Sequence, residues 1–149
     1  MTTARSRPML TRSNADRLQR ILAQFSWAAR TDKVALLESR LAAASVVPDD
    51  EVPPDLVTMN SRVHFENLAS GSARIVELAW PGEALADDAR VSVLSSTGVA
   101  LLGLRVDEEA EVATPEGRRL RVKVLDVLFQ PEAERRNPPR PPSPPPQAA

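Results

Sequence analysis

Apolar residues recur with two different periods in this chain, and the change of period near Leu56 constrains the fold most. Before Leu56, two segments place apolar residues three or four apart, as on one face of a helix. Over residues 56–129 apolar and polar residues mostly alternate, which is typical of antiparallel strands with one buried face. The run SSTGVALLGLRVDEE, residues 95–109, interrupts this alternation with a short apolar turn between two glycines.

The helical pattern occupies residues 13–47. Ser13 can cap the first helix, with Asp16 where a capping box has Glu or Gln, and Thr31 can cap the second. Two narrow apolar stripes follow these caps: Leu18, Ile21, Leu22 and Phe25, then Val34, Leu37, Leu41 and Ala44. We therefore expect a short antiparallel helical hairpin.

The alternating pattern predicts about five strands, at residues 56–68, 72–80 and 90–94 and in a hairpin over 109–129. The first strand should bury Val57, Met59, Val63 and Phe65 and expose Thr58, Asn60, Arg62, His64 and Glu66. The last strand should bury Leu120, Val122, Val124 and Leu128, while Leu125, Val127 and Phe129 indicate that the second half of its other face is also covered.

The interrupting run fits a short helix packed on this sheet. The helix would begin at Ser96 or Thr97 and end at Gly103, where a positive φ is often needed. Val99, Leu101 and Leu102 would then cover the apolar face of the sheet. The expected fold class is α+β: the N-terminal helical hairpin, then a curved antiparallel sheet packed on one short helix.

Three segments fall outside this pattern. We expect residues 1–12 to be disordered, residues 48–55 to form a Pro-rich connector, and residues 135–149 to form a disordered Pro-rich tail. Eight of the 14 prolines lie from Pro131 onwards. An inert tail and a ligand for an aromatic groove are both compatible with this composition.

The composition limits the kinds of binding site and reaction that this chain can have. A net charge of −1 gives no overall basic field for nucleic acid or anionic membranes. The lack of Cys excludes disulfides and thiolate metal sites, and no apolar run reaches the roughly 18 residues of a membrane span. No GxxxxGK[ST], GxGxxG or HExxH motif occurs. We expect a soluble, cytoplasmic protein without metal or cofactor.

Two polar features of the strands remain open to interpretation. His64 is the single histidine and has no neighbouring nucleophile or metal ligand in the sequence, which favours a surface role. Arg119, Arg121 and Lys123 form a basic row that suits either a solvated strand face or an acidic or phosphate-bearing partner.

Three stretches together resemble the bacterial Rnk family, the regulators of nucleoside diphosphate kinase, which are relatives of GreA and GreB. These stretches are PPDLVTMNSRVHFENL, GVALLGLRVDEE and LDVLFQPEAE, and the similarity spans about residues 13–134. The resemblance implies a GreA/GreB C-terminal-like, FKBP-like domain over residues 56–134, preceded by a short coiled-coil finger over residues 13–47. In that superfamily the domain docks on RNA polymerase at the rim of the secondary channel, and the finger points into the channel.

The Gre pattern around the short helix, S-x-S-P-[apolar]-x-x-A-L-L-G, identifies the expected contact region. Ser96 stands where the pattern has proline, and Asp107 where a following V-G-D has glycine. The resemblance assigns polymerase contact to Ser95, Ser96, Thr97, Gly98 and Val99. Residues 95–98 should face outward, while Leu101 and Leu102 hold the sheet.

The expected finger tip, SWAARTDK, bears on transcript cleavage. Gre factors use two acidic tip residues to help hold a Mg²⁺ ion in the polymerase. Here Asp32 stands between basic residues, and Glu38 lies about 9 Å further along the helix and about 240° around it. Arg30 belongs to the same tip, and Trp27 is either folded back on the helices or exposed as a contact.

These observations favour a non-enzymatic, monomeric regulator that binds RNA polymerase and competes with Gre factors without stimulating cleavage. A Gre-like cleavage factor that uses Asp32 is the alternative, and an adaptor acting through the Pro-rich tail is a third hypothesis. Prolyl isomerase activity would need an aromatic-lined pocket, for which the domain offers only Phe65, Trp80 and Phe129.

Overall fold

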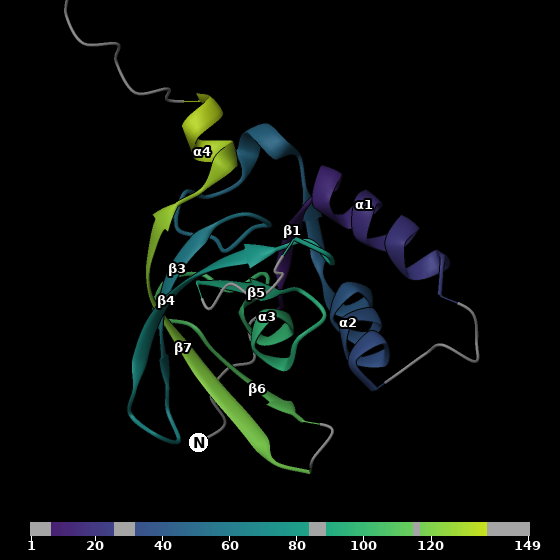
Figure 1. The fold of residues 1–149 in the computed structure, drawn as a ribbon. Helices are drawn as coiled ribbons and strands as arrows, with labels where there is room; N and C mark the ends of the chain where they lie inside the picture. The colour runs from purple at the N-terminus through teal and green to yellow at the C-terminus, as the bar shows by residue number, and fades with distance from the viewer. Residues whose placement is uncertain (1–6, 26–31, 84–88, 115–116, 137–149) are drawn as a thin grey trace, which may run out of the picture.

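The computed structural model describes residues 7–25, 32–83, 89–114 and 117–136, and confirms a mixed α+β chain (Figure 1). The elements are β1 (Met9–Thr11), α1 (Arg12–Ala23), α2 (Asp32–Ala43), β2 (Ser45–Val47), the 3₁₀ helix η2 (Asp49–Glu51), β3 (Arg62–Asn67), β4 (Ala73–Ala79), β5 (Arg90–Ser92), α3 (Ser96–Leu101), β6 (Glu109–Ala113), β7 (Arg119–Phe129) and α4 (Pro131–Arg136). Within these ranges no helix is long and apolar enough to cross a membrane.

The main sheet has the strand order β5-β4-β3-β7-β6. Neighbouring strands are antiparallel except at one edge, where β5 runs parallel to β4 and Arg90 lies opposite Glu77. The expectation of a purely antiparallel sheet is therefore wrong at this edge. The connection after β4 is longer than a hairpin turn, and it brings the chain back alongside the second half of β4, where the Glu77 N–H donates to the Ala89 carbonyl.

The strand expected from residue 56 begins only at Arg62. The Ser61 N–H donates to the Thr58 carbonyl, and Asn60 has a φ of 65°, so the backbone turns here instead of extending. Thr58, expected on the exposed face, is 1% exposed. Residues 57–59 are consequently buried on all sides as a turn that leads into β3.

β7 changes its buried face halfway along. Val122 and Val124 are buried as expected, but Leu128 is 48% exposed and Phe129 is 42% exposed. The pairing of β3 with β7 shifts register at two points. An extra residue in one strand moves the following side chains to the other face, so Val127 packs on the core where alternation had placed Leu128.

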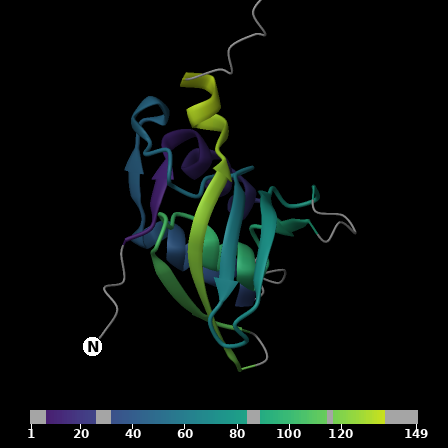
Figure 2. The ribbon, with the colours of Figure 1, turned by 90° about the vertical axis from the view of Figure 1, so that its left-hand side faces the viewer.

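One hydrophobic core joins the sheet to the helices. α3 lies against one face of the sheet, and Figure 2 shows the sheet in front with α3 and α2 behind it. The stripe residues Leu18, Leu22, Val34 and Leu37 belong to the same buried cluster as Val63 of β3. α1 and α2 therefore pack on the sheet domain as well as on each other.

Regular structure begins earlier and ends later than the sequence pattern indicated. Residues 9–11, expected to be disordered, form β1 parallel to β2, because Leu10 can bury its side chain in the core there. Thr11, not Ser13, caps α1, by accepting a hydrogen bond from the Asn14 N–H at 3.1 Å. At the other end, Arg136 of α4 donates to the carbonyls of Asp50 and Val52.

Candidate partner-binding site

The candidate site is the docking segment, defined as residues 95–103, and it begins with a capped helix. The Ser95 hydroxyl accepts a hydrogen bond from the Gly98 N–H at 3.0 Å and donates to the Ser92 carbonyl at 2.6 Å. This cap places Ser96 and Thr97 in the first turn of α3, where both are half-buried. Their side chains form no hydrogen bond with any residue that the structure describes, and both are partly exposed, so they are accessible for a contact.

Gly98 and Val99 lie on the inner side of the segment. Val99 is 0% exposed, and Gly98 is also buried. The expectation that residues 95–98 all face outward is thus corrected for Gly98, because the helical turn from the Ser95 cap directs residue 98 at the backbone of Ser92. Both residues can shape the docking segment, but in this conformation neither offers a side chain to a partner.

The apolar half of the segment agrees with the sequence pattern. Leu101 and Leu102 are 0% and 1% exposed, and α3 contacts β6 and β7. Gly103 follows the helix with a φ of 83°, as a helix-ending glycine does. Its N–H donates to the Val57 carbonyl and its own carbonyl accepts from the Met9 N–H, so β1 is fixed to the end of α3.

Arg40 of α2 also holds the end of α3, and sequence analysis missed it. Its Nη2 lies 2.6 Å from the Leu102 carbonyl oxygen and 3.3 Å from that of Ala100. Burial lowers the pKa of Arg40 from 12.5 to about 10, partly opposed by Glu108, so the guanidinium stays charged at neutral pH. A cation suits a helix C-terminus, but no local pattern links α2 to carbonyls about sixty residues away.

We expect Arg40→Met to lower the free energy of unfolding by about 1–3 kcal/mol, because two carbonyl oxygens lose their charged donor while an apolar stem remains. Urea unfolding followed by far-UV circular dichroism measures this loss. Arg20→Met, the same change at an exposed residue of α1, should cost no more than about 0.5 kcal/mol. Equal losses in the two variants would show that the α3 contact contributes nothing.

Asp107 adopts the conformation that suits the glycine of the Gre pattern. Its φ is 71°, and its N–H donates to the Val124 carbonyl at 2.8 Å. Asp enters this left-handed region more readily than most residues with a side chain. The departure from the pattern is therefore accommodated without a change of backbone path.

Residues of the expected finger tip lie mostly outside the described part of the chain. Trp27 and Arg30 are outside it, and Asp32 is described only as the first residue of α2. The tip assignments therefore stay predictions.

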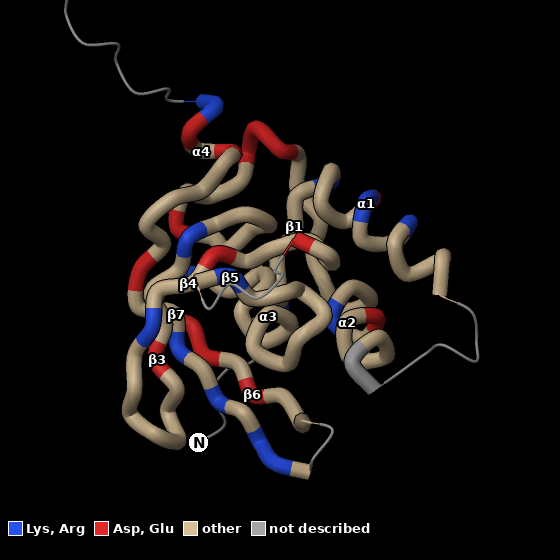
Figure 3. The backbone as a smooth tube through the Cα atoms, viewed as in Figure 1, with Lys and Arg blue, Asp and Glu red and all other residues tan. Residues whose placement is uncertain are grey.

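Two residues of the basic row of β7 are paired with acids on β6. Arg119 contacts Glu111 at 3.0 Å and Arg121 contacts Glu109 at 3.3 Å. Figure 3 shows acidic positions on β6 beside basic positions on β7. These pairs favour the interpretation of a solvated strand face over that of a nucleic-acid site. His64 is half-buried in β3, opposite Ile75 of β4 and Asp126 of β7.

Known proteins are similar to this chain in sequence and in fold. Residues 52–129 match the family described as transcription elongation factor, GreA/GreB, C-terminal. The regulator of nucleoside diphosphate kinase of Escherichia coli K12 is 37% identical over 120 residues, 80% of this chain and 88% of that protein. The transcription elongation factor GreA of Nitratidesulfovibrio vulgaris is 34% identical over 98 residues, 66% of this chain and 61% of that protein. The solved structure of a GreA/GreB factor from Nitrosomonas europaea, 34% identical, superposes with a TM-score of 0.65 over 84% of this chain and 100% of that one.

Proposed function

This chain belongs to the Rnk family and, through residues 52–129, to the GreA/GreB transcription elongation factors. From this membership we propose that it is a transcription regulator that binds RNA polymerase at the rim of the secondary channel. One structural observation carries the proposal most directly. The docking segment is held at both ends, by the Ser95 cap and by Arg40, while Ser96 and Thr97 are left accessible between them.

In this proposal Ser96, Thr97 and the Ser95 backbone form the contact, and Gly98 and Val99 act by fixing the position of α3. Residues 56–134 correspond to an FKBP-like domain and residues 13–47 to a coiled-coil finger, and the protein acts as a monomer in the cytoplasm. Ser96 replaces the proline of the Gre pattern, but the Ser95 cap supports the helix start without it.

We further propose that the protein competes with Gre factors without stimulating transcript cleavage. α1 and α2 have 12 residues each, which corresponds to about 18 Å of helix. In the sequence the tip carries one carboxylate, Asp32, next to basic residues, whereas a Mg²⁺ site needs converging oxygen ligands. The alternative function is Gre-like cleavage with Asp32 as the acidic tip residue.

Thr97→Arg should weaken binding to core RNA polymerase by about tenfold or more, because a bulky charge would be forced into the contact. Its melting temperature should equal that of the native protein, since Thr97 is not part of the core. Competition against fluorescently labelled GreA measures the affinity. Ala69→Arg adds the same charge in the exposed turn between β3 and β4 and should leave affinity unchanged. A Thr97→Arg variant with native affinity would place the contact surface elsewhere.

A transcript cleavage assay separates the two functions. With a backtracked RNA polymerase complex, we expect the native protein to reduce cleavage stimulated by GreA and to add none of its own. Stimulation by the native protein that is lost in Asp32→Ala would instead establish the alternative.

A further inference from the structure

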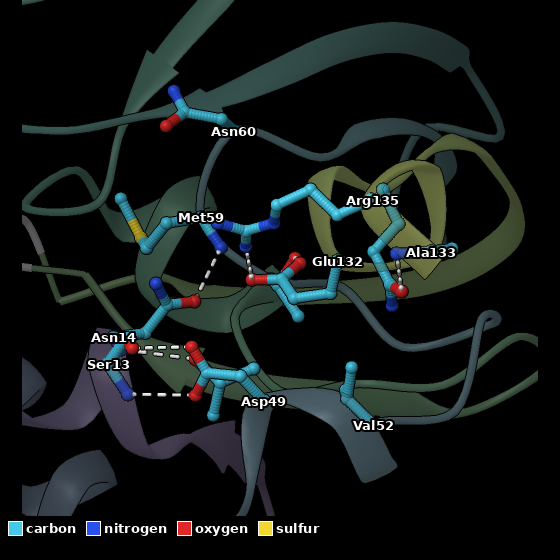
Figure 4. A network of polar contacts seen from close by, with 12 residues as sticks. Ser13, Asn14, Asp49, Val52, Met59, Asn60, Glu132, Ala133 and Arg135 are labelled. Atoms are coloured by element: carbon cyan, nitrogen blue, oxygen red, sulfur yellow. Dashed lines mark hydrogen bonds and ion pairs between the residues drawn. The ribbon is translucent and has the colours of Figure 1, made fainter. Parts of the chain in front are cut away.

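A pocket of about 230 Å³ lies away from the docking segment, where the N-terminal half of α1, the turn before β3, the end of β4 and the start of α4 meet. Figure 4 shows part of this region from close by. The residues that define its chemistry are Asn14, Arg17, Asn60, Trp80, Glu132 and Arg135. None of them belongs to the proposed polymerase contact.

Two side-chain amides in this pocket have fixed orientations. The Asn14 Oδ1 accepts a hydrogen bond from the Met59 N–H at 3.1 Å, and the Asn60 Oδ1 accepts from the Trp80 Nε1–H, also at 3.1 Å. Because only the oxygen of an amide can accept, both NH₂ groups remain as donors. Among the described residues neither NH₂ group has an acceptor, as Figure 4 shows for Asn14.

The N–H donors of Asn14 indicate which kind of group could bind in the pocket. Asn14 is only 8% exposed, and buried polar groups normally have hydrogen-bond partners. Its oxygen is already used, so a group that enters the pocket and bonds to the Asn14 side chain would have to be an acceptor. Asn60 contributes a second NH₂ group to the same lining.

Charges in the lining favour an anionic acceptor. The Arg17 guanidinium lies 3.9 Å from the centroid of the Trp80 ring, and Arg135 lies on the α4 side of the pocket. Glu132 is the acid of the described lining, but one of its oxygens accepts from the Thr58 hydroxyl at 2.6 Å and the other lies 3.7 Å from Arg135. The lining thus carries two guanidinium groups and one carboxylate, and a second carboxylate, Asp49, lies beside it and accepts from the Ser13 N–H.

We propose that this pocket binds an oxyanion group, the phosphate or carboxylate of a small molecule. Guanidinium and amide N–H groups match the geometry of both anions. The volume is below the range of about 300–1,000 Å³ that is usual for drug-sized ligands, which indicates a single small head group. A bound anion would connect α1, the turn before β3 and α4, and would therefore stabilise the folded chain by linkage.

Titration of the full-length, ¹⁵N-labelled protein with sodium phosphate, sodium acetate and sodium chloride at equal ionic strength tests this proposal. We expect saturable shifts of the Asn14 and Asn60 NH₂ signals and of the Trp80 indole N–H, together with a rise in melting temperature. Saturation by phosphate alone, by acetate alone or by both identifies the source of the oxyanion. Shifts that follow ionic strength equally in all three salts would overturn the site.

An isosteric variant provides the second measurement. Asn14→Asp keeps an oxygen for the Met59 N–H but replaces the NH₂ donors with a negative oxygen, and should weaken anion binding by about tenfold or more. Asn67→Asp makes the same charge change at the end of β3, where the Asn67 oxygen accepts from the Ala69 N–H, and should keep native affinity. If Asn14→Asp does not fold, Asn60→Asp tests the same pocket, since Asp tolerates its φ of 65°. Native affinity in the folded pocket variant would exclude the proposal.

Discussion

Replacing Leu101 with Ala is expected to lower the free energy of unfolding by about 2–5 kcal/mol. Leu101 is 0% exposed and belongs to the core cluster that joins α3 to the sheet and to α1 and α2. The substitution removes apolar atoms from contact with that core and leaves a cavity that the surrounding strands can fill only in part. Urea unfolding monitored by far-UV circular dichroism measures the change in the unfolding midpoint.

Leu128→Ala is the matched control for this prediction. It makes the same chemical change in β7, at a side chain that is 48% exposed because the register shifts turn it outward. Its cost should stay below about 1 kcal/mol. Similar losses for Leu101→Ala and Leu128→Ala would mean that the β7 register, and with it the assignment of the core face, is wrong.

Local patterns in the sequence were sufficient for several elements. Alternation located β4 and the β6–β7 hairpin, because each of these strands alternates covered and accessible side chains over part of its length. The apolar residues between Ser95 and Gly103 indicated α3, since a serine cap and a helix-ending glycine both act within one turn of the chain.

Features that depend on distant partners could not be predicted in this way. Alternation shows that a side chain is covered, but not by which element, so the parallel pairing of β5 and the register shifts in β7 escaped it. Leu10 has a buried position only because β2 lies beside it. Arg40 and Asn14 look like ordinary polar helix residues, yet their partners are the end of α3 and the turn at Met59.

These long-range contacts also concern the proposed function. Arg40 and the Met9 N–H hold the C-terminal end of the docking segment, so the position of α3 depends on α2 and β1 as well as on the sheet. A contact surface of two small residues needs a rigid support, because ordering it on binding would cost conformational entropy. We therefore propose that the helices before the sheet domain contribute to docking through the position of α3.

Gly98→Ala should reveal how rigidly the other end of α3 is held. In an exposed helix this change stabilises by about 1 kcal/mol, but here we expect a loss of about 1–3 kcal/mol from overpacking. A Cβ atom at residue 98 would lie 2.0 Å from the Ser92 carbonyl oxygen and 2.8 Å from its carbon. That oxygen also accepts hydrogen bonds from the Ser95 N–H and hydroxyl, so it cannot move away without disturbing the Ser95 cap.

The displaced cap should carry Ser96 and Thr97 with it, so Gly98→Ala should also weaken polymerase binding under conditions in which the variant is fully folded. Thr97→Ala, the adjacent change at the surface, should alter stability by no more than about 0.5 kcal/mol. Circular dichroism and the GreA competition assay measure the two effects separately. A Gly98→Ala variant as stable as the native protein would show that α3 can shift freely from Ser92. A less stable variant with native affinity would instead show that docking does not depend on where α3 begins.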